Sequence, residues 1–329
     1  MSIEPAALLS ALRIDRTVSG SDLAARFGVT RAAVWKQIRG LRTLGASVEA
    51  VAGRGYRLAW PFEALDADAV RAQLDRAEFD PALRKRLRNI AVHWQIDSTN
   101  SELLRTAADG APDLSICLAE MQNAGRGRRG RSWLSPLGAN VYFSLLKRFE
   151  SGMGALSGLS LAVGVALTEA LEDCGAAGIG LKWPNDVVVE GRKLAGILVE
   201  AGGEFLGPCF AVIGIGINLR LPENVETGQP ATDLARICAT AVPSRNRVVA
   251  RLLAHLVDAL DSFGGGGFAP FAARYAARDA LAGKRVRVQV AGGARDGIAM
   301  GVDARGALRV RHGAALAVYD SVDVSVRAA

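Results

Sequence analysis

A short glycine-rich segment of the chain carries four closely spaced arginines. Residues 125–131 read Gly-Arg-Gly-Arg-Arg-Gly-Arg, so the guanidinium groups repel one another unless an anion or water neutralises them. Guanidinium groups match the oxygens of phosphates and carboxylates, and glycines let such a loop open and close. The alternative is a solvated basic loop. Trp133, two residues further on, either covers a flat ligand ring or simply packs.

The same segment matches the glycine pattern of dinucleotide-binding loops at Gly125, Gly127 and Gly130. In that fold the glycine loop opens a helix inside a βαβ unit and an acidic residue follows. Residues 131–136 (Arg-Ser-Trp-Leu-Ser-Pro) are a poor helix start, and no acidic residue of that kind follows. We therefore interpret the match as accidental.

Two polar clusters stand at the ends of predicted strands. Residues 97–100 (Asp-Ser-Thr-Asn) follow the strand-like run 93–96 and precede the helical pattern 101–107, so they cap a helix by default and could also hydrogen-bond a ligand. Residues 182–186 (Lys-Trp-Pro-Asn-Asp) interrupt two strand patterns, at 179–182 and 187–189. Taken singly, each cluster is more often plain structure than a site.

Two predicted apolar strands contain residues that could accommodate a ligand, one by a positive charge and the other by missing side chains. Lys193 lies at the start of the strand 192–200, and a lysine entering an apolar strand is costly unless it meets an anion. Gly214 and Gly216 alternate along the buried strand 210–218, so their missing side chains leave space on one face of the sheet.

Composition limits what kind of protein presents these residues. The chain has 329 residues, of which 50% are hydrophobic and 22% charged, which is a globular composition long enough for two or three domains. No two of the four cysteines have Cys-x-x-Cys spacing, so we expect reduced, buried thiols and no structural metal. The N-terminal residues lack a secretory signal, and the apolar stretch 156–171 is too short to span a bilayer. We expect a cytoplasmic protein.

The net charge of +7 is concentrated at the two ends of the chain. Residues 1–60 hold nine Lys and Arg against four Asp and Glu, and residues 282–329 hold eight against four, which leaves −2 for the middle. A basic N-terminal unit suggests a polyanionic partner, although solubility alone explains such a charge almost as often.

The N-terminal pattern supplies a shape for that charge. We expect helices over 8–14, over 21–28 with Ser21 as N-cap and Gly28 as terminator, and over 31–44 after a cap at Thr30. A hairpin over 48–58, with a turn at 53–55, follows as a wing. This is the pattern of a winged helix-turn-helix, and the alternative is a basic bundle that packs on the rest of the chain. The residues expected at DNA are Ser21, Thr30, Arg31, Trp35, Lys36, Arg39 and Arg54.

The last segment changes character. Residues 285–290 alternate strictly between charged or polar and apolar, and short apolar runs at 297–300, 308–311 and 316–319 are separated by turns. This spacing predicts a small SH3-like β-barrel. Between the N-terminal unit and the first polar cluster, residues 60–90 contain two charged helical stretches.

In this order along the chain, the motifs 97–100, 122–131, 182–186, 192–200 and 214–218 resemble those of the biotin protein ligases. With the winged helix, the chain is similar over nearly its whole length to the bifunctional kind that also represses biotin synthesis genes. The resemblance implies an α/β (α+β) multidomain protein: a winged helix at 1–62, a mixed-sheet, class II synthetase-like catalytic domain at 63–281 and an SH3-like domain at 282–329.

The resemblance also implies an activity. Such a ligase activates biotin with ATP and Mg²⁺ to biotinyl-5′-AMP and acylates a lysine of the biotin carboxyl carrier protein of acetyl-CoA carboxylase. The implied partners are that carrier, operator DNA and a second copy of the chain on binding biotinyl-AMP, with no membrane. Lipoate ligases are the nearest alternative enzymes, and a DNA-binding biotin sensor without ligase activity is the other. The arginine-rich segment 125–131, which we call the arginine loop, and residues 182–186 argue against a lipoate ligase.

Residue roles follow from the same resemblance. Lys193, Arg126 and Arg128 are the implied catalytic residues, with Lys193 on the biotin carboxylate, and Asp186 is implied to hold Mg²⁺ with ATP. The implied biotin pocket contains Ser98, Thr99, Asn100, Gln122, Arg126, Gly127, Arg128, Lys193, Gly196, Gly214 and Gly216. The implied ATP site contains Arg126, Arg128, Arg129, Arg131, Trp133, Asn185, Asp186, Asn218 and Arg327. Dimerisation is implied to use edge strands such as residues 197–200.

Overall fold

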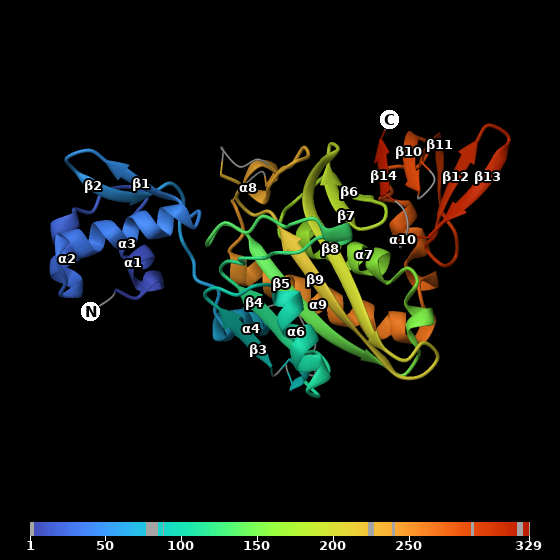
Figure 1. Cartoon of the computed structure of the whole chain (residues 1–329), viewed down its shortest axis with the longest axis horizontal. Coiled ribbons are helices and arrows are strands. Elements are labelled where there is room, and N and C mark those ends of the chain that lie inside the picture. Colours follow the sequence, from blue (N-terminus) through green and yellow to red (C-terminus); the bar gives the residue numbers. More distant parts are fainter. Residues whose placement is uncertain are drawn as a thin grey trace.

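The structure is a computed structural model, and it describes residues 3–76, 85–87, 89–222, 227–238, 241–290, 293–320 and 325–328. Three groups of elements follow one another along the chain, and Figure 1 shows them from left to right, from the blue N-terminal lobe to the red C-terminal sheet. No helix in these described ranges is both long and apolar enough to cross a bilayer.

The N-terminal lobe, residues 3–58, has the predicted helix-turn-helix and wing. It contains helices α1 (Pro5–Ala11), α2 (Gly20–Phe27) and α3 (Arg31–Thr43) and strands β1 (Val48–Val51) and β2 (Gly55–Leu58). The Thr30 hydroxyl caps α3 by accepting a hydrogen bond from the backbone N–H of Ala33 at 3.1 Å. Gly28 ends α2 in the left-handed conformation, with φ of 63°.

Two helix starts in this lobe differ from the sequence prediction. The cap of α2 is Ser19, whose hydroxyl accepts from the N–H of Asp22 at 3.0 Å, so the predicted cap at Ser21 was wrong. Ser19 has the extended backbone that a cap needs, whereas Ser21 already lies inside the helix. Helix α1 begins at Pro5 after the cap Glu4 and ends before Leu12, which is extended, so it does not reach Ile14.

A seven-stranded mixed sheet forms the centre of the molecule. Its order is β3-β4-β5-β9-β8-β7-β6, and only β3 and β4 run parallel. The strands are β3 (Ile90–His93), β4 (Ile116–Ala119), β5 (Val141–Phe149), β6 (Ile179–Lys182), β7 (Asp186–Val189), β8 (Arg192–Gly203) and β9 (Cys209–Ile217). The strands predicted at 179–182, 187–189, 192–200 and 210–218 all form. The strand predicted at 93–96 lies at 90–93 instead, and β4 and β5 were not predicted.

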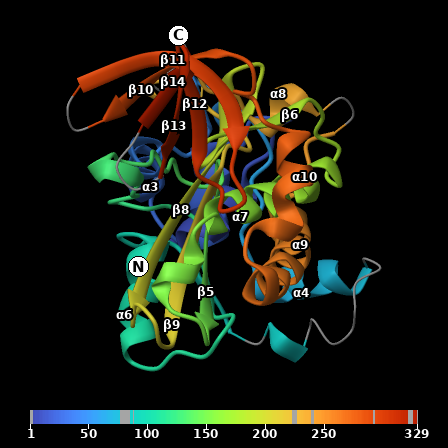
Figure 2. The ribbon, with the colours of Figure 1, turned by 90° about the vertical axis from the view of Figure 1, so that its right-hand side faces the viewer.

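Helices cover both faces of this sheet. Figure 2 looks along it, with α6 (Thr99–Ala108) on one side and α7 (Leu159–Glu172) and α9 (Arg245–Gly266) on the other. Helix α4 (Ala67–Arg76) packs on α9 and forms the first predicted charged helix of the linker, whereas most of the second lies outside the described residues. The apolar stretch 156–171 is the buried helix α7, as predicted.

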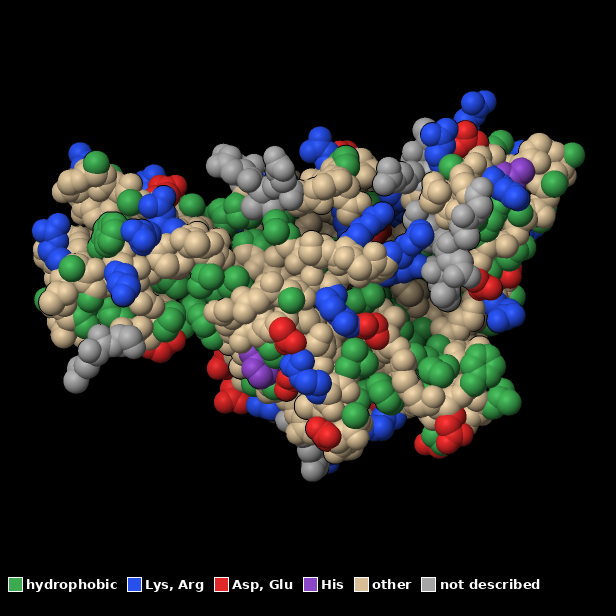
Figure 3. Space-filling model, in the orientation of Figure 1, with side chains coloured by type: hydrophobic (Ala, Val, Ile, Leu, Met, Phe, Trp, Pro, Cys, Tyr) green, Lys and Arg blue, Asp and Glu red, His purple; other side chains and the backbone are tan. Residues whose placement is uncertain are grey.

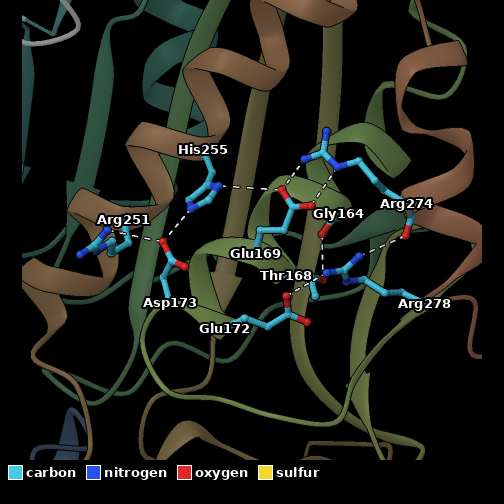
Figure 4. A network of polar contacts seen from close by, with 9 residues as sticks. All are labelled: Gly164, Thr168, Glu169, Glu172, Asp173, Arg251, His255, Arg274 and Arg278. Carbon is cyan, nitrogen blue, oxygen red and sulfur yellow. Dashed lines mark hydrogen bonds and ion pairs between the residues drawn. The ribbon is translucent and has the colours of Figure 1, made fainter. Parts of the chain in front are cut away.

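Helix α9 was not anticipated from the sequence. Its apolar side chains recur at helical spacing, but residues 264–267 are four glycines, which weaken that pattern, and three of them belong to the helix. Acidic residues in the last turns of α7 and at its C-cap, Asp173, tie it to α9 and to the region of α10 (Ala272–Ala276), as Figure 4 shows. Asp173 lies 2.9 Å from His255 on α9, and Glu172 accepts from Arg278, just after α10, at 2.9 Å. These contacts hold the helices as one layer behind the sheet.

The C-terminal segment forms a five-stranded antiparallel sheet. Its order is β13-β12-β11-β10-β14, with β10 (Arg285–Val290), β11 (Gly293–Val302), β12 (Leu308–His312), β13 (Ala315–Tyr319) and β14 (Ser325–Ala328). Its inner side chains join the same hydrophobic core as the central sheet, including Val286, Leu308 and Val310. The short helices α8 (Leu234–Ile237), η2 (Met153–Leu156) and η3 (Ala269–Phe271) lie in connections between the larger elements.

The cysteines are free thiols, as predicted. Cys117, Cys174 and Cys209 are buried, and burial raises the pKa of the Cys117 thiol to about 12. Cys238 is only partly buried, which corrects the expectation that all four are interior.

A buried ion pair joins the linker after the N-terminal lobe to the central sheet. Arg245 and Glu120 lie 2.7 Å apart and each side chain is 3% exposed. Arg245 also donates to the carbonyl of Glu63, and Glu120 accepts from the N–H of Leu65 at 2.6 Å. The members of the ion pair therefore hold Glu63 and Leu65 of the linker in place.

We expect Glu120→Ala to destabilise the protein by about 3 kcal/mol, because it leaves the Arg245 charge buried without its carboxylate. Urea unfolding measures the change. The control is Asp68→Ala, which removes the exposed ion pair with Arg71 and should cost less than about 1 kcal/mol. Equal effects of the two substitutions would contradict the prediction.

Candidate active site

A pocket of about 1020 Å³ lies between the central sheet, the start of α6 and the arginine loop. It brings together nearly every residue that the sequence predicts at a ligand: Ser98, Thr99, Asn100, Gln122, Arg126, Gly127, Arg128, Arg129, Arg131, Trp133, Asn185, Asp186, Lys193, Gly196, Gly214, Gly216 and Asn218. Arg327, the remaining member of that set, is placed by its backbone. It lies opposite Arg287 in the pairing of β14 with β10, and the adjacent Val326 lines the pocket.

The floor of the pocket is a stretch of sheet without side chains. Gly216 lies directly opposite Gly196, which in turn lies opposite Asp186, and Gly214 lies opposite Leu198. Directly opposed residues share a face of the sheet, and so do residues two apart on one strand. The three glycines therefore clear one continuous surface, with Asp186 at its end.

A β-bulge places Lys193 over this floor. In β8, Leu194 is an extra residue, because Val187 pairs with Ala195 and Val188 pairs with Lys193. Lys193 and Gly196 are three residues apart and would face opposite sides of a regular strand, but the bulge brings the lysine to the glycine side, where a Cβ on Gly196 would lie 3.0 Å from its Cε.

The anion that meets Lys193 in this structure is Asp186. The Lys193 ammonium lies 2.7 Å from the Asp186 carboxylate, and the two side chains are 16% and 17% exposed. The same ammonium lies 5.2 Å from the centre of the Trp133 ring, which supplies a cation–π contact. A second carboxylate entering the pocket would compete with Asp186 for this lysine.

Ser98, Thr99 and Asn100 of the polar cluster 97–100 line the pocket, so the cluster does more than begin a helix. Helix α6 already begins at Thr99, and the side chain of its N-cap Ser98 makes no capping hydrogen bond, which corrects the default interpretation. The Asp97 carboxylate is turned outward to Arg105, whose hydrogen bond lowers the Asp97 pKa to about 2. Thr99 and Asn100 are buried in the first turn, beside the glycine floor.

A chain of hydrogen bonds orients these polar groups. The side-chain oxygen Oε1 of Gln122 accepts a hydrogen bond from the backbone N–H of Thr99 at 2.9 Å. The Asn100 amide donates to Glu200 at 2.9 Å, and its oxygen accepts from the Ser144 hydroxyl at 2.6 Å. A Cβ on Gly214 would lie 2.1 Å from that Asn100 oxygen, so the glycine is required for the asparagine to lie there.

The arginine loop closes the pocket from above as a single 3-10 turn, η1 (Arg128–Gly130), and not as an α-helix. This confirms that the glycine pattern is not a dinucleotide-binding loop. Arg126 forms an ion pair with Glu200, and Arg128 donates to the Asn185 amide oxygen at 3.4 Å. Burial lowers the pKa of Arg128, and Asp186 partly offsets that by favouring the charged form.

The Trp133 ring occupies the glycine floor. A Cβ on Gly216 would lie 2.3 Å from this ring, and one on Gly196 would lie 2.8 Å from it. The Trp133 indole N–H is buried and has no hydrogen-bond partner among the described residues. A ligand that takes the floor must therefore slide under this ring or displace it.

Asn218 has a structural task within the pocket wall. Its amide donates to the carbonyl oxygens of Lys193 and Thr232, at 3.2 and 3.1 Å. Its side chain therefore links the start of β8 to Thr232. Residues 227–231, just before Thr232, also line the pocket, and no sequence pattern indicated their contribution.

A second hollow lies on the N-terminal lobe, between α3 and the wing. It is lined by Arg31 and Trp35 of α3, by Ser21 and by Arg54 at the tip of the wing. Thr30, Lys36 and Arg39 are exposed on or beside α3 outside this hollow, and the Arg39 guanidinium lies 5.0 Å from the centre of the Trp35 ring. Figure 3 shows blue side chains spread over this lobe.

Known proteins share both parts of this arrangement. A biotin/lipoate A/B protein ligase model matches residues 92–218 and a helix-turn-helix model matches residues 6–57. A bifunctional ligase/repressor from Salmonella typhimurium is 38% identical over 99% of this chain and 98% of its own length. The chain belongs to the bifunctional ligase/repressor branch of the biotin/lipoate A/B protein ligase family.

Other members of the ligase family agree. A biotin–[acetyl-CoA-carboxylase] ligase from Mycobacterium tuberculosis is 37% identical over 79% of this chain and 98% of its own length. The structure of the biotin protein ligase from Aquifex aeolicus in complex with biotin and ATP covers 74% of this chain and is itself covered completely, with 27% identity and a TM-score of 0.63.

The region that matches the ligase family also contains pocket residues that the sequence patterns did not single out. Tyr142 and Leu198 line the pocket, and Glu200 holds Asn100 and the loop arginine Arg126. Strand alternation is the signal that could have found Tyr142, because it lies directly opposite Gly216. The Glu200 contacts depend on α6 and the loop, which no local pattern places.

Within the described residues, no three His, Cys, Asp or Glu side chains are grouped so as to hold a metal ion. Mg²⁺ in phosphate-transfer sites is usually held by one or two carboxylates together with substrate phosphates. In this ligase-family pocket Asp186, beside the Asn185 amide, fits such a shared site and would not bind the ion alone.

Proposed function

We propose that this chain is an ATP-dependent biotin ligase. In the first step the biotin carboxylate attacks the α-phosphate of ATP, which forms biotinyl-5′-AMP and releases pyrophosphate. In the second step a lysine amine of the biotin carboxyl carrier protein of acetyl-CoA carboxylase attacks the mixed anhydride and releases AMP. The observation that carries this proposal is the half-buried Lys193–Asp186 pair, which lies in one pocket with the floor of glycines and the loop of arginines.

The biotin half of the site is the glycine floor with its polar rim. The fused ring of biotin would lie over Gly196, Gly214 and Gly216, with Thr99, Asn100 and Gln122 along the rim and with Ser98 and Gly127 nearby. The biotin carboxylate would take the place of Asp186 at Lys193. Lys193 is already oriented by its neighbours, so the binding energy is not spent on ordering it.

The nucleotide half is the region of Asn185, Asp186 and the arginine loop. Bringing a carboxylate to a phosphate joins two anions, so cations must neutralise both sets of oxygens. Lys193 pairs with Asp186 and Arg128 donates to the adjacent Asn185, so both would supply that charge. Arg126, Arg129 and Arg131 would add to it. Mg²⁺ held by Asp186 and the ATP phosphates would neutralise further charge. Trp133 would shield the adenine or the bound biotin from solvent, and Arg327 would approach this side from β14.

Loop closure would protect the reactive intermediate. The arginine loop covers the pocket from one side, and water would hydrolyse the mixed anhydride if it entered. Because Arg126 is paired with Glu200 in this structure, closure over an adenylate would require that ion pair to give way to contacts with the ligand.

We propose in addition that the N-terminal lobe binds operator DNA and represses biotin synthesis genes when biotinyl-AMP is bound. The hollow between α3 and the wing presents Arg31, Trp35 and Arg54 at the positions that a winged helix-turn-helix uses for the major groove and the adjacent backbone. Two copies would bind two half-sites. They would pair through β8, where residues 198–203 pair with β9 but extend beyond the register of β7.

The proposed domain division follows the elements. The winged helix comprises residues 1–62, the catalytic domain 63–281 and the C-terminal domain 282–329. We propose that the five-stranded C-terminal sheet is SH3-like, because β14 returns to pair with β10. ATP-dependent activation also favours a cytoplasmic location, where ATP is abundant.

The test incubates purified protein with labelled biotin, MgATP and a biotin carboxyl carrier domain. We expect label on the carrier only with ATP present, no label when the carrier's target lysine is replaced by arginine, and no product when lipoate replaces biotin. Transfer of lipoate in place of biotin would identify a lipoate-type ligase. If no adenylate forms and no carrier is labelled, the ligase proposal fails and the chain is a biotin-sensing regulator at most.

We expect Arg54→Ala to weaken DNA binding, because Arg54 at the tip of the wing would contact a DNA phosphate. The slope of log affinity against log salt concentration should fall by about 1, the value for one lost phosphate contact. The probe is a duplex selected from a random-sequence library by the wild-type protein with biotin and ATP. Arg285→Ala is the control, since Arg285 is exposed on the C-terminal sheet. A salt dependence unchanged by Arg54→Ala would exclude a phosphate contact at the wing.

A further inference from the structure

A tight turn of the C-terminal sheet contacts Trp183, which lies two residues before Asn185 of the nucleotide half of the site. Asp303 to Ala307 join β11 to β12, and we call these residues the 303–307 turn. The Asp303 carboxylate accepts from the backbone N–H groups of Arg305 and Ala307, at 2.9 Å each, and so holds the turn closed from within. Gly306, with φ of 83°, lies buried at its tip.

The tip of the turn is packed against the start of α7. A Cβ on Gly306 would lie 2.9 Å from the Cα of Gly158, and the Ser157 hydroxyl donates to the Arg305 carbonyl at 3.0 Å. The fit leaves no space for the turn to shift toward α7, so its position relative to the central sheet is well defined.

The same turn holds Trp183. The Trp183 indole N–H donates to the Gly306 carbonyl at 3.1 Å, and this large side chain is only 1% exposed. On the other side of the motif, the Ser160 hydroxyl donates to the Pro184 carbonyl at 3.1 Å. The dipeptide before Asn185 and Asp186 is therefore fixed by the turn and by α7 together.

The two residues after Pro184 carry the polar groups of the nucleotide half. Asn185 donates from its amide to the Ile197 carbonyl at 2.8 Å and accepts from Arg128, and Asp186 pairs with Lys193. A shift of the Trp183 ring would move both groups, and a displacement of about 1 Å in a reacting constellation can cost on the order of 100-fold in rate.

We propose that Asp303 and Trp183 are positioning residues for the nucleotide: through the Gly306 carbonyl, the 303–307 turn sets where Asn185 and Asp186 meet ATP. The inference rests on the proposed ligase function. Neither residue is catalytic, since Asp303 acts through the turn and Trp183 through the two residues after Pro184. The biotin floor lies on β8 and β9, so we expect it to respond less to the turn than the nucleotide half does.

The experiment compares Asp303→Ala with Asp303→Asn in the full-length protein, measuring biotinyl-adenylate formation against ATP and biotin separately. Asp303→Ala removes the acceptor that closes the turn, and we expect the KM for ATP to rise about tenfold while the affinity for biotin changes less than about twofold. Asp303→Asn keeps an acceptor oxygen and should restore the wild-type KM. Asp296→Ala, which breaks an exposed ion pair on the same sheet, is the control.

A second variant tests the contact from the other side. Trp183→Phe keeps a flat aromatic ring but loses the donor to Gly306, and it should raise the KM for ATP in the same direction. The proposal is overturned if KM for ATP is unchanged in Asp303→Ala, if both KM values rise together, or if Asp303→Asn behaves like Asp303→Ala. A wild-type protein that forms no adenylate would instead overturn the ligase function itself.

Discussion

Lys193→Ala is expected to reduce the rate of biotinyl-adenylate formation about a thousandfold. The lysine ammonium lies beside Gly196 of the glycine floor, 2.7 Å from Asp186. Preorganised charge of this kind at a reacting centre is worth on the order of 100- to 1000-fold in rate. Its removal also leaves the Asp186 carboxylate, 17% exposed, to repel the incoming biotin carboxylate and the phosphates.

Single-turnover formation of adenylate measures this effect without the carrier step. Lys193→Arg should retain part of the activity, because it keeps the charge but its planar fork does not reproduce a point charge on a flexible stem. Arg192→Ala is the matched control, because its side chain is exposed at the start of the same strand. We expect that control to stay within about twofold of wild type. Lys193→Ala retaining a tenth of the wild-type rate would contradict the assigned role.

Gly214→Ala is expected to weaken biotin binding at least about 100-fold. The added methyl carbon would lie 2.1 Å from the Asn100 side-chain oxygen, far inside contact distance. Asn100 cannot withdraw easily, because Ser144 holds that oxygen at 2.6 Å and Glu200 holds its amide at 2.9 Å. The asparagine must therefore swing over the floor where the ligand ring would lie, or the sheet must open.

Titration calorimetry with biotin measures the loss, and thermal unfolding separates it from misfolding. The matched control is Gly264→Ala near the end of α9, where an added Cβ would have nothing within 4 Å. That substitution should leave biotin binding unchanged and raise stability by about 0.5–1 kcal/mol, since alanine favours the helix over glycine. Unchanged biotin affinity in Gly214→Ala would show that the floor is not the ligand surface.

Much of the pocket could be predicted because its residues carry local signals. Gly214 and Gly216 are two apart on a strand, and this spacing alone puts them on one face. Lys193 in an apolar strand required an anion, and the structure supplies Asp186. Thr30 and Gly28 delimit helices through backbone conformations that are specific to their types, and both predictions are confirmed.

Other features had no unique local signal. Ser19 and Ser21 are both good caps, and the choice between them depends on where the backbone leaves the extended conformation, which the packing of the lobe decides. Helix α9 ends in a run of glycines that weakens the helical pattern, and its burial against α7 and α4 overrides that weakness. The segment 97–100 could either cap a helix or contact a ligand. Because α6 already begins at Thr99, Thr99 and Asn100 lie in its first turn beside the pocket.

Residue types and their spacing are enough to tell which chemical groups the chain carries, in what order, and which neighbours share a strand face. Which distant groups meet depends on how the elements pack. The Asp186–Lys193 pair depends on the register of β7 and β8 and on the bulge at Leu194, and the Trp183–Gly306 contact joins residues 123 positions apart. Such contacts follow from strand pairing and the docking of whole elements, which are collective properties of the packed core, whereas propensity and periodicity describe only near neighbours along the chain.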